Sequence, residues 1–216
     1  MENIINSQIK TSRKLFLLGI AGSILWLLAD IVLGYLPGGI AKAGFMSDPN
    51  ILGQVLHGAP LWRFPVSAVI CTLGMTLSIF GYIGIYSSYK YKGLLSKIVL
   101  LCAMAASVGG AVYHTICTSS EWIYVKLGGG EKSFALLTDF MAGQTLPMKV
   151  CGLCWCLFGL LFLISVIAKR TVFPRWCVIF NIMIFYPLLM MAGYPGYMSG
   201  GALIMFLGLF LFLKEE

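Results

Sequence analysis

The sequence predicts an all-α integral membrane protein, a polytopic bundle of six transmembrane helices. Of its 216 residues, 59% are hydrophobic and 11% are charged, whereas soluble domains contain about 45–50% apolar and about 25% charged residues. The mean hydropathy is +0.91. The apolar residues also form runs close to the roughly 20 residues that a helix needs to cross a bilayer core. The chain lacks the polar residues to cover a soluble globule, so residues 1–216 are interpreted as a single transmembrane domain.

Six apolar segments are expected to cross the membrane. In chain order they are residues 15–36, 64–86, 95–117, 148–168, 175–193 and 197–213. The first resembles a signal peptide because basic residues precede it. It is longer than the about 7–15 apolar residues of a signal h-region, however, and is interpreted as a retained span. Pro195 and Gly196 predict a tight turn between the last two spans.

Basic residues predict the orientation of these spans. They gather before the first span, in the second–third and fourth–fifth connections, and after the last span: Lys10, Arg13, Lys14, Lys90, Lys92, Lys97, Lys169, Arg170, Arg175 and Lys214. Because cytoplasmic loops carry the excess of Lys and Arg, both termini are predicted to lie in the cytoplasm of a multi-pass protein of the cell membrane. The net charge of +7 follows this pattern, so no nucleic-acid partner is expected.

The two long outer connections each predict a short helix. After the first span, Asp48 is a candidate N-cap with Pro49 at the first helical position, and the helix should end before Gly58. After the third span, Ser133 is a candidate N-cap for a helix that ends at Gly143. Both helices are expected to lie on the outer interface or to plug the mouth of the bundle.

Small residues predict which helix faces point into the bundle, because in lipid they let helix backbones approach closely. Four stripes have helical spacing: Gly19, Ser23, Trp26 and Asp30 in the first span; Ser67, Cys71, Gly74, Ser78 and Gly81 in the second; Ala103, Ser107, Gly110 and His114 in the third; and Lys149, Gly152, Cys156 and Gly159 in the fourth. The first and third stripes end in an ionisable residue.

These two residues, Asp30 and His114, are the candidate catalytic residues. At 1.5 Å per residue they should lie roughly 9 Å and ~5 Å below the outer surface. A charge within the membrane costs at least ~2.5 kcal/mol on insertion scales, so such residues mark functional sites. A carboxylate can orient an imidazole, which titrates near neutral pH, and the two form a minimal acid–base pair. Alternatively, Asp30 pairs with Arg63 or Lys149 to lock the helices, and His114 is a core histidine.

Other polar residues, at the outer end of the bundle or in the fifth span, are candidate ligand-binding residues. The set comprises Tyr35, His57, Arg63, Tyr113, Lys149 and Asn181, with Glu121, Trp122 and Asp139 at the same interface. His57 alternatively complements a helix dipole. Asn181, near Pro187, marks an interhelical hydrogen bond and a kink, or lines the cavity. Two histidines without a third clear ligand predict no metal site, and no cofactor is expected.

Three functions compete at this stage. In the first, Asp30 and His114 bind, or process by acid–base chemistry, a lipid- or isoprenoid-like amphipathic small molecule. In the second, Asp30 is the proton or cation site of a small transporter; paired interrupted segments that mark inverted repeats are not evident, but a homodimer would supply the missing half. In the third, the chain is a non-catalytic membrane partner, such as an immunity-type protein. Convergence of polar residues at one depth favours the first, and membrane lipids are partners in all three.

Overall fold

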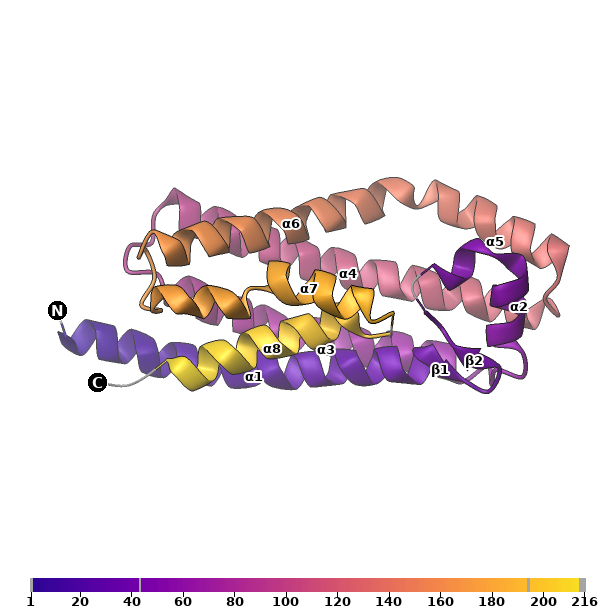
Figure 1. Ribbon diagram of the computed structural model, residues 1–216, viewed down its shortest axis with the longest axis horizontal. Coiled ribbons are helices and arrows are strands. Elements are labelled where there is room, and N and C mark those ends of the chain that lie inside the picture. Colours follow the sequence, from indigo (N-terminus) through magenta and orange to yellow (C-terminus); the bar gives the residue numbers. More distant parts are fainter. Residues whose placement is uncertain (1, 43, 194, 214–216) are drawn as a thin grey trace.

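The computed structural model describes residues 2–42, 44–193 and 195–213. Figure 1 shows an elongated bundle whose long helices run side by side. Within the described residues, four helices are long and apolar enough to cross a membrane. They are α1 (Glu2–Gly34, of which Ile9–Gly34 meets this criterion), α3 (Arg63–Ser87), α4 (Leu94–Lys126) and α6 (Thr145–Ile167). The all-α membrane bundle expected from composition is therefore present, and α4 continues well beyond the predicted end of its span at residue 117.

Two shorter apolar helices, α7 (Ile182–Met191) and α8 (Tyr197–Phe212), complete the bundle. The expected span 197–213 corresponds to α8. The expected span 175–193 is not one continuous helix, because a 3-10 helix, η2 (Arg175–Phe180), precedes α7 and the backbone is extended at the residue between them.

Asn181 explains this interruption. Its side-chain oxygen accepts a hydrogen bond from the Met183 backbone N–H at 2.9 Å and so caps α7. Its Nδ2 donates to the Gly159 carbonyl of α6 at 3.0 Å. The predicted interhelical hydrogen bond is thus confirmed, and the same side chain that joins the two helices also begins α7.

The end of the bundle opposite the chain termini carries a group of small elements that we call the cap (Figure 1). It consists of the antiparallel strands β1 (Tyr35–Leu36) and β2 (Gly39–Ile40), the 3-10 helix η1 (Phe45–Ser47), α2 (Pro49–Leu56) and α5 (Glu131–Gly143). A hydrophobic cluster separate from that of the bundle holds the cap together; it includes Leu52, Phe64, Tyr124 and Leu137.

Both cap helices form where the sequence places them, but only one begins as predicted. Asp48 caps α2, accepting hydrogen bonds from the N–H groups of Asn50 and Ile51, with Pro49 as first helical residue. Ser133 is not an N-cap, because α5 begins at Glu131. The Ser133 hydroxyl donates instead to the Gly129 carbonyl, four residues back.

The small-residue stripes of α1, α3 and α4 face the interior as predicted, and glycine explains the α1–α3 contact. All five stripe residues of α3 are buried. A Cβ placed on Gly74 would lie 2.6 Å from the backbone nitrogen of Trp26 and 2.7 Å from the carbonyl oxygen of Gly22. The two backbones are therefore in direct contact, which only glycine permits at these positions.

The stripe predicted for α6 is confirmed only at Gly159, which is buried. Lys149, Gly152 and Cys156 are exposed, and the buried face otherwise carries Cys151, Trp155, Phe158, Phe162 and Ser165. The Trp155 ring lies 6.0 Å from the Trp26 ring in a tilted arrangement, and Phe158 lies 5.0 Å from Tyr82, measured between ring centroids. Large aromatic rings fill most of this interface, so the predicted stripe marks the inward face only at Gly159.

The basic connections lie together at the end of the bundle that holds both termini (Figure 1). A bridge between Tyr89 and Thr171 joins the α3–α4 and α6–η2 connections, and the Lys90 N–H donates to the Arg170 carbonyl at 2.9 Å. The first turns of α1 lie at the same end, whereas Lys214 lies outside the described residues. The basic connections on which the predicted orientation depends therefore lie at one end of the folded bundle (Figure 1).

Candidate functional site

A pocket of about 720 Å³ lies where the cap meets the bundle. Its walls come from α1, residues 41, 42 and 44–47, Met75 of α3, α4, α5, the first turns of α6 and the α7–α8 connection. Most of the lining is apolar and includes Trp26, Phe134, Leu137, Met141 and Met148. The volume falls within the roughly 300–1,000 Å³ that small-molecule sites occupy.

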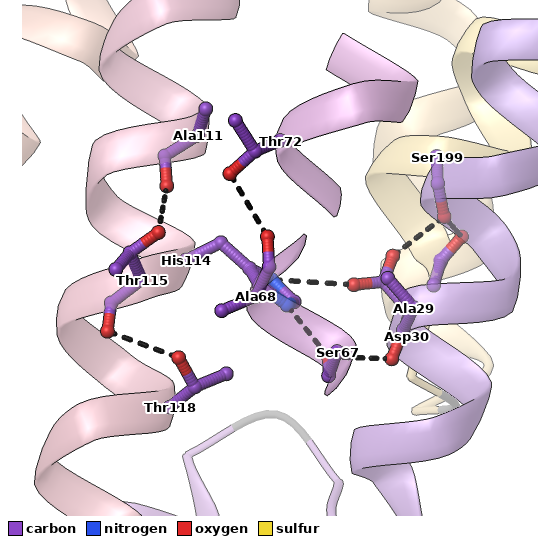
Figure 2. Close-up of polar contacts among 11 residues, drawn as sticks. Ala29, Asp30, Ser67, Ala68, Thr72, Ala111, His114, Thr115, Thr118 and Ser199 are labelled. Carbon is purple, nitrogen blue, oxygen red and sulfur yellow. Dashed lines mark hydrogen bonds and ion pairs between the residues drawn. The ribbon is translucent and has the colours of Figure 1, made fainter. Parts of the chain in front are cut away.

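Asp30 and His114 lie together at this pocket (Figure 2). Nδ1 of His114 is 3.6 Å from Oδ1 of Asp30. The other carboxylate oxygen, Oδ2, accepts a hydrogen bond from the Ser199 hydroxyl of α8 at 2.6 Å. Nε2 of His114 is 2.9 Å from Oγ of Ser67 in α3. We call these four residues the Asp30–His114 cluster; each comes from a different helix.

The hydrogen bonds of Ser67 decide which nitrogen of His114 faces the carboxyl group. Ser67 has one hydroxyl proton, which it donates to the Ala29 carbonyl at 2.9 Å (Figure 2). Its contact with Nε2 therefore requires that nitrogen to carry a proton, because the hydroxyl can only accept there. Nδ1 is then the nitrogen that can exchange a proton with Asp30. Ser67 is fully buried, so it positions the imidazole and is not an accessible nucleophile.

Packing brings these residues together. The contact of Gly22 and Gly74 holds α1 against α3, which places the Ala29 carbonyl within reach of Ser67. Asp30 and His114 end the predicted small-residue stripes of α1 and α4, and both are largely buried, with 16% and 10% of their side chains exposed. The polar cluster thus lies where α1 and α3 are held in direct backbone contact.

Glu121 is the second buried acid of the pocket. It lies on α4, is 1% exposed, and lines the same pocket as Asp30 and His114. Its Oε2 makes no hydrogen bond within the described part of the chain. Seven residues separate it from His114, which corresponds to two helical turns or about 10 Å along one face of α4.

The predicted ligand-binding residues divide into one that reaches the pocket and five that the structure places elsewhere. Tyr113 lines the pocket. Arg63 donates from Nη1 to the Tyr35 backbone carbonyl at 2.5 Å and lies near the Trp62 ring. Neither Arg63 nor Tyr35 is among the described lining residues, so the alternative pairing of Asp30 with Arg63 is not what the structure shows.

His57, Lys149 and Asn181 are also not among the described residues that line the pocket. His57 is exposed at the C-cap of α2. Lys149 is exposed on α6, so the alternative pairing of this lysine with Asp30 is likewise absent from the contacts of the described residues. Asn181 is buried and uses both polar atoms of its side chain in helix contacts.

Several residues of the pocket or of the Asp30–His114 cluster carry no sequence signal that marks them as parts of a site. Ser199 follows a turn, and the segment 41–47 has no helical or strand periodicity; their positions depend on the fold. Glu121 did carry a signal, because it repeats the face of His114 two turns later. It was assigned to the interface only, since the third span was predicted to end at residue 117.

No group of three or more His, Cys, Asp or Glu side chains in the described ranges is arranged to hold a metal ion. The fold and the pocket together define a multi-pass helical membrane protein in which a largely apolar pocket adjoins a buried Asp–His pair. The chain belongs to DUF6796, a family of unknown function, and the match covers residues 1–216. Neither curated proteins nor solved structures give a significant match.

Proposed function

We propose that this membrane protein binds an amphipathic small molecule, lipid- or isoprenoid-like, in the pocket between bundle and cap. The observation that carries the proposal is the position of the Asp30–His114 cluster at the wall of a pocket that is otherwise lined mainly by apolar side chains. Such a pocket suits a ligand with an apolar body and a polar group, because the apolar lining contributes affinity and a few polar groups fix orientation.

The cost of the cluster supports a functional role. Burying an acid and a histidine within a membrane bundle is unfavourable, and buried ion pairs contribute little net stability compared with apolar packing. The aromatic rings of Trp155, Phe158 and Tyr82 already join α3 and α6. We therefore infer that Asp30 and His114 are retained for the ligand.

The proposal includes a six-span topology in the cell membrane, with α7 and α8 as the last two spans and both termini in the cytoplasm. All the basic connections of the described residues lie at the end of the bundle with the termini (Figure 1), and positive residues mark the cytoplasmic side. The pocket then lies in the outer half, where α5 and η1 contribute to its lining. Cysteines introduced at Lys92 and at Lys132, in a background with native cysteines removed, test this by labelling with a membrane-impermeant maleimide in intact cells. Labelling at Lys92 and not at Lys132 would reverse the orientation.

Native mass spectrometry of gently extracted protein tests ligand binding. The wild type is compared with Asp30→Asn, His114→Ala and the matched control Asp139→Asn; Asp139 is exposed on α5 and outside the described pocket lining. A bound species present in the wild type and the control, and lost in both folded pocket variants, is the expected result, and its mass gives the ligand class. If no bound species is found and both pocket variants only have lower melting temperatures, the cluster serves to pack the helices. The cap would then be tested for protein partners.

Acid–base processing of the ligand is the second candidate function. It is favoured by the approach of Nδ1 of His114 to within 3.6 Å of Asp30, with Nε2 fixed by Ser67. An enzyme that moves a proton on its ligand should exchange ligand hydrogen for deuterium when the loaded protein is held in D₂O, and Asp30→Asn should abolish that exchange. A ligand recovered without deuterium from the wild type limits the role to binding.

A further inference from the structure

The polar groups of the pocket differ in how far the protein itself satisfies them. Within the Asp30–His114 cluster, Asp30 contacts Ser199 and His114, and His114 contacts Ser67. Both ring nitrogens and both carboxylate oxygens therefore already face a protein partner. This cluster can hold a proton, but it offers few free hydrogen-bonding positions to a ligand.

Glu121 is the opposite case. Its side chain is 1% exposed, it lines the pocket, and its Oε2 has no hydrogen-bond partner among the described residues. A buried carboxyl oxygen without a partner is unfavourable, more so when charged, and native structures retain few of them. Water or a ligand that donates a hydrogen bond removes this cost, and the pocket has room for a ligand of drug size.

The other residues of the lining favour a cation over an anion. Its acids are Asp30 and Glu121, and its basic residue of fixed charge is Lys42, which is exposed. Tyr113 and Phe134, on α4 and α5, place aromatic rings in the same lining. Aromatic faces attract ammonium groups, most strongly when the site is desolvated. A carboxylate or phosphate ligand would meet two acids, whereas an amine meets acids and rings.

We propose that the pocket ligand is a cationic amphiphile, an amine whose N–H group donates to Glu121 while its apolar body lies along α5 and α6. This rests on the proposed function and adds the charge of the ligand to it. Glu121 is then the residue that recognises the ligand, and the Asp30–His114 cluster lies about two turns of α4 deeper. An ammonium that donates to a buried carboxylate forms a charge-assisted hydrogen bond, which is roughly twice as strong as a neutral one.

The test compares four probes that share a twelve-carbon chain and differ at the head: dodecylamine, dodecanol, dodecanoate and dodecyltrimethylammonium. Binding to the full chain in lipid nanodiscs is measured at pH 7 at matched membrane mole fractions. Wild-type protein should bind the amine about tenfold or more tightly than the carboxylate, the least that a charge-assisted hydrogen bond contributes. The trimethylammonium probe has no N–H and should bind more weakly than the amine.

Glu121→Gln should remove most of the preference for the amine over the carboxylate, whereas Asp30 still disfavours an anion. Glu131→Gln is the matched control, because Glu131 is exposed at the start of α5 and outside the described lining. Equal binding of amine and carboxylate to wild-type protein overturns the amine assignment while leaving the amphiphile pocket intact, and so does a preference that Glu121→Gln leaves unchanged. Failure of all four probes to bind overturns the proposed function together with the inference. The comparison of probes on wild-type protein stands even if Glu121→Gln does not fold.

Discussion

Replacing Gly74 by alanine tests the backbone contact between α1 and α3 that positions the Asp30–His114 cluster. The new Cβ would lie 2.6 Å from the Trp26 nitrogen and 2.7 Å from the Gly22 carbonyl oxygen, well inside the roughly 3.5–4.0 Å of an ordinary carbon contact. Both obstacles are backbone atoms of α1, so no side chain can rotate away. The helices must separate, and overpacking of this kind costs about 1–3 kcal/mol.

Gly152→Ala is the matched control. Gly152 is exposed within α6, and no atom lies within 4 Å of a Cβ placed there. Both substitutions gain the same helix propensity, about 1 kcal/mol, so the difference between the two variants isolates the steric cost. At about 2–4 °C per kcal/mol for a chain of this size, Gly74→Ala should melt about 2–12 °C below Gly152→Ala. Thermal unfolding in mild detergent, followed by tryptophan fluorescence, measures both, and equal melting temperatures would refute the close approach of the helices.

Substitutions at three further residues test local contacts. Ser67→Ala removes the partner of His114 Nε2 and should lower the free energy of unfolding by about 1–3 kcal/mol, measured by thermal unfolding; an unchanged stability would mean that the histidine is not held there. Asn181→Ala removes the cap of α7 and the bond to Gly159 and should cost about 1–2 kcal/mol, whereas Asn181→Asp should recover only the cap. Asp48→Ala should raise hydrogen exchange at the first amides of α2 without affecting α3; uniform protection would contradict the capping role.

The sequence predicted the fold where one physical signal dominated. Apolar length identified the four long helices, because a span must satisfy its backbone hydrogen bonds internally. Small residues at helical spacing identified the inward faces of α1, α3 and α4. The same rule failed on α6 except at Gly159, since Trp155 and Phe158 fill space at the helix interface and make close backbone approach unnecessary.

The fifth span differs from its prediction for another reason. Residues 175–193 are apolar enough throughout to suggest one helix. Hydropathy does not show that a single polar side chain can both cap one helix and bind another. Asn181 begins α7 and binds α6 at once, which depends on the distance between two helices that are far apart in the sequence. Ser133 failed as a cap on a smaller scale, because the glycines before it already end the preceding helix and α5 begins earlier.

For the candidate site, sequence alone determined which residues are costly enough to need an explanation: an acid and a histidine within apolar spans, at similar depth and on packing faces. Only the tertiary structure decided their partners. In the structure His114 lies beside Asp30 and Ser67. Arg63, Lys149 and His57 are not among the described residues that line the pocket. Glu121 lines the pocket, and its Oε2 has no hydrogen-bond partner among the described residues. The physical reason is that periodicity fixes the face of a helix on which a residue lies, whereas partners depend on helix rotation, separation and the cap, which are set by long-range packing.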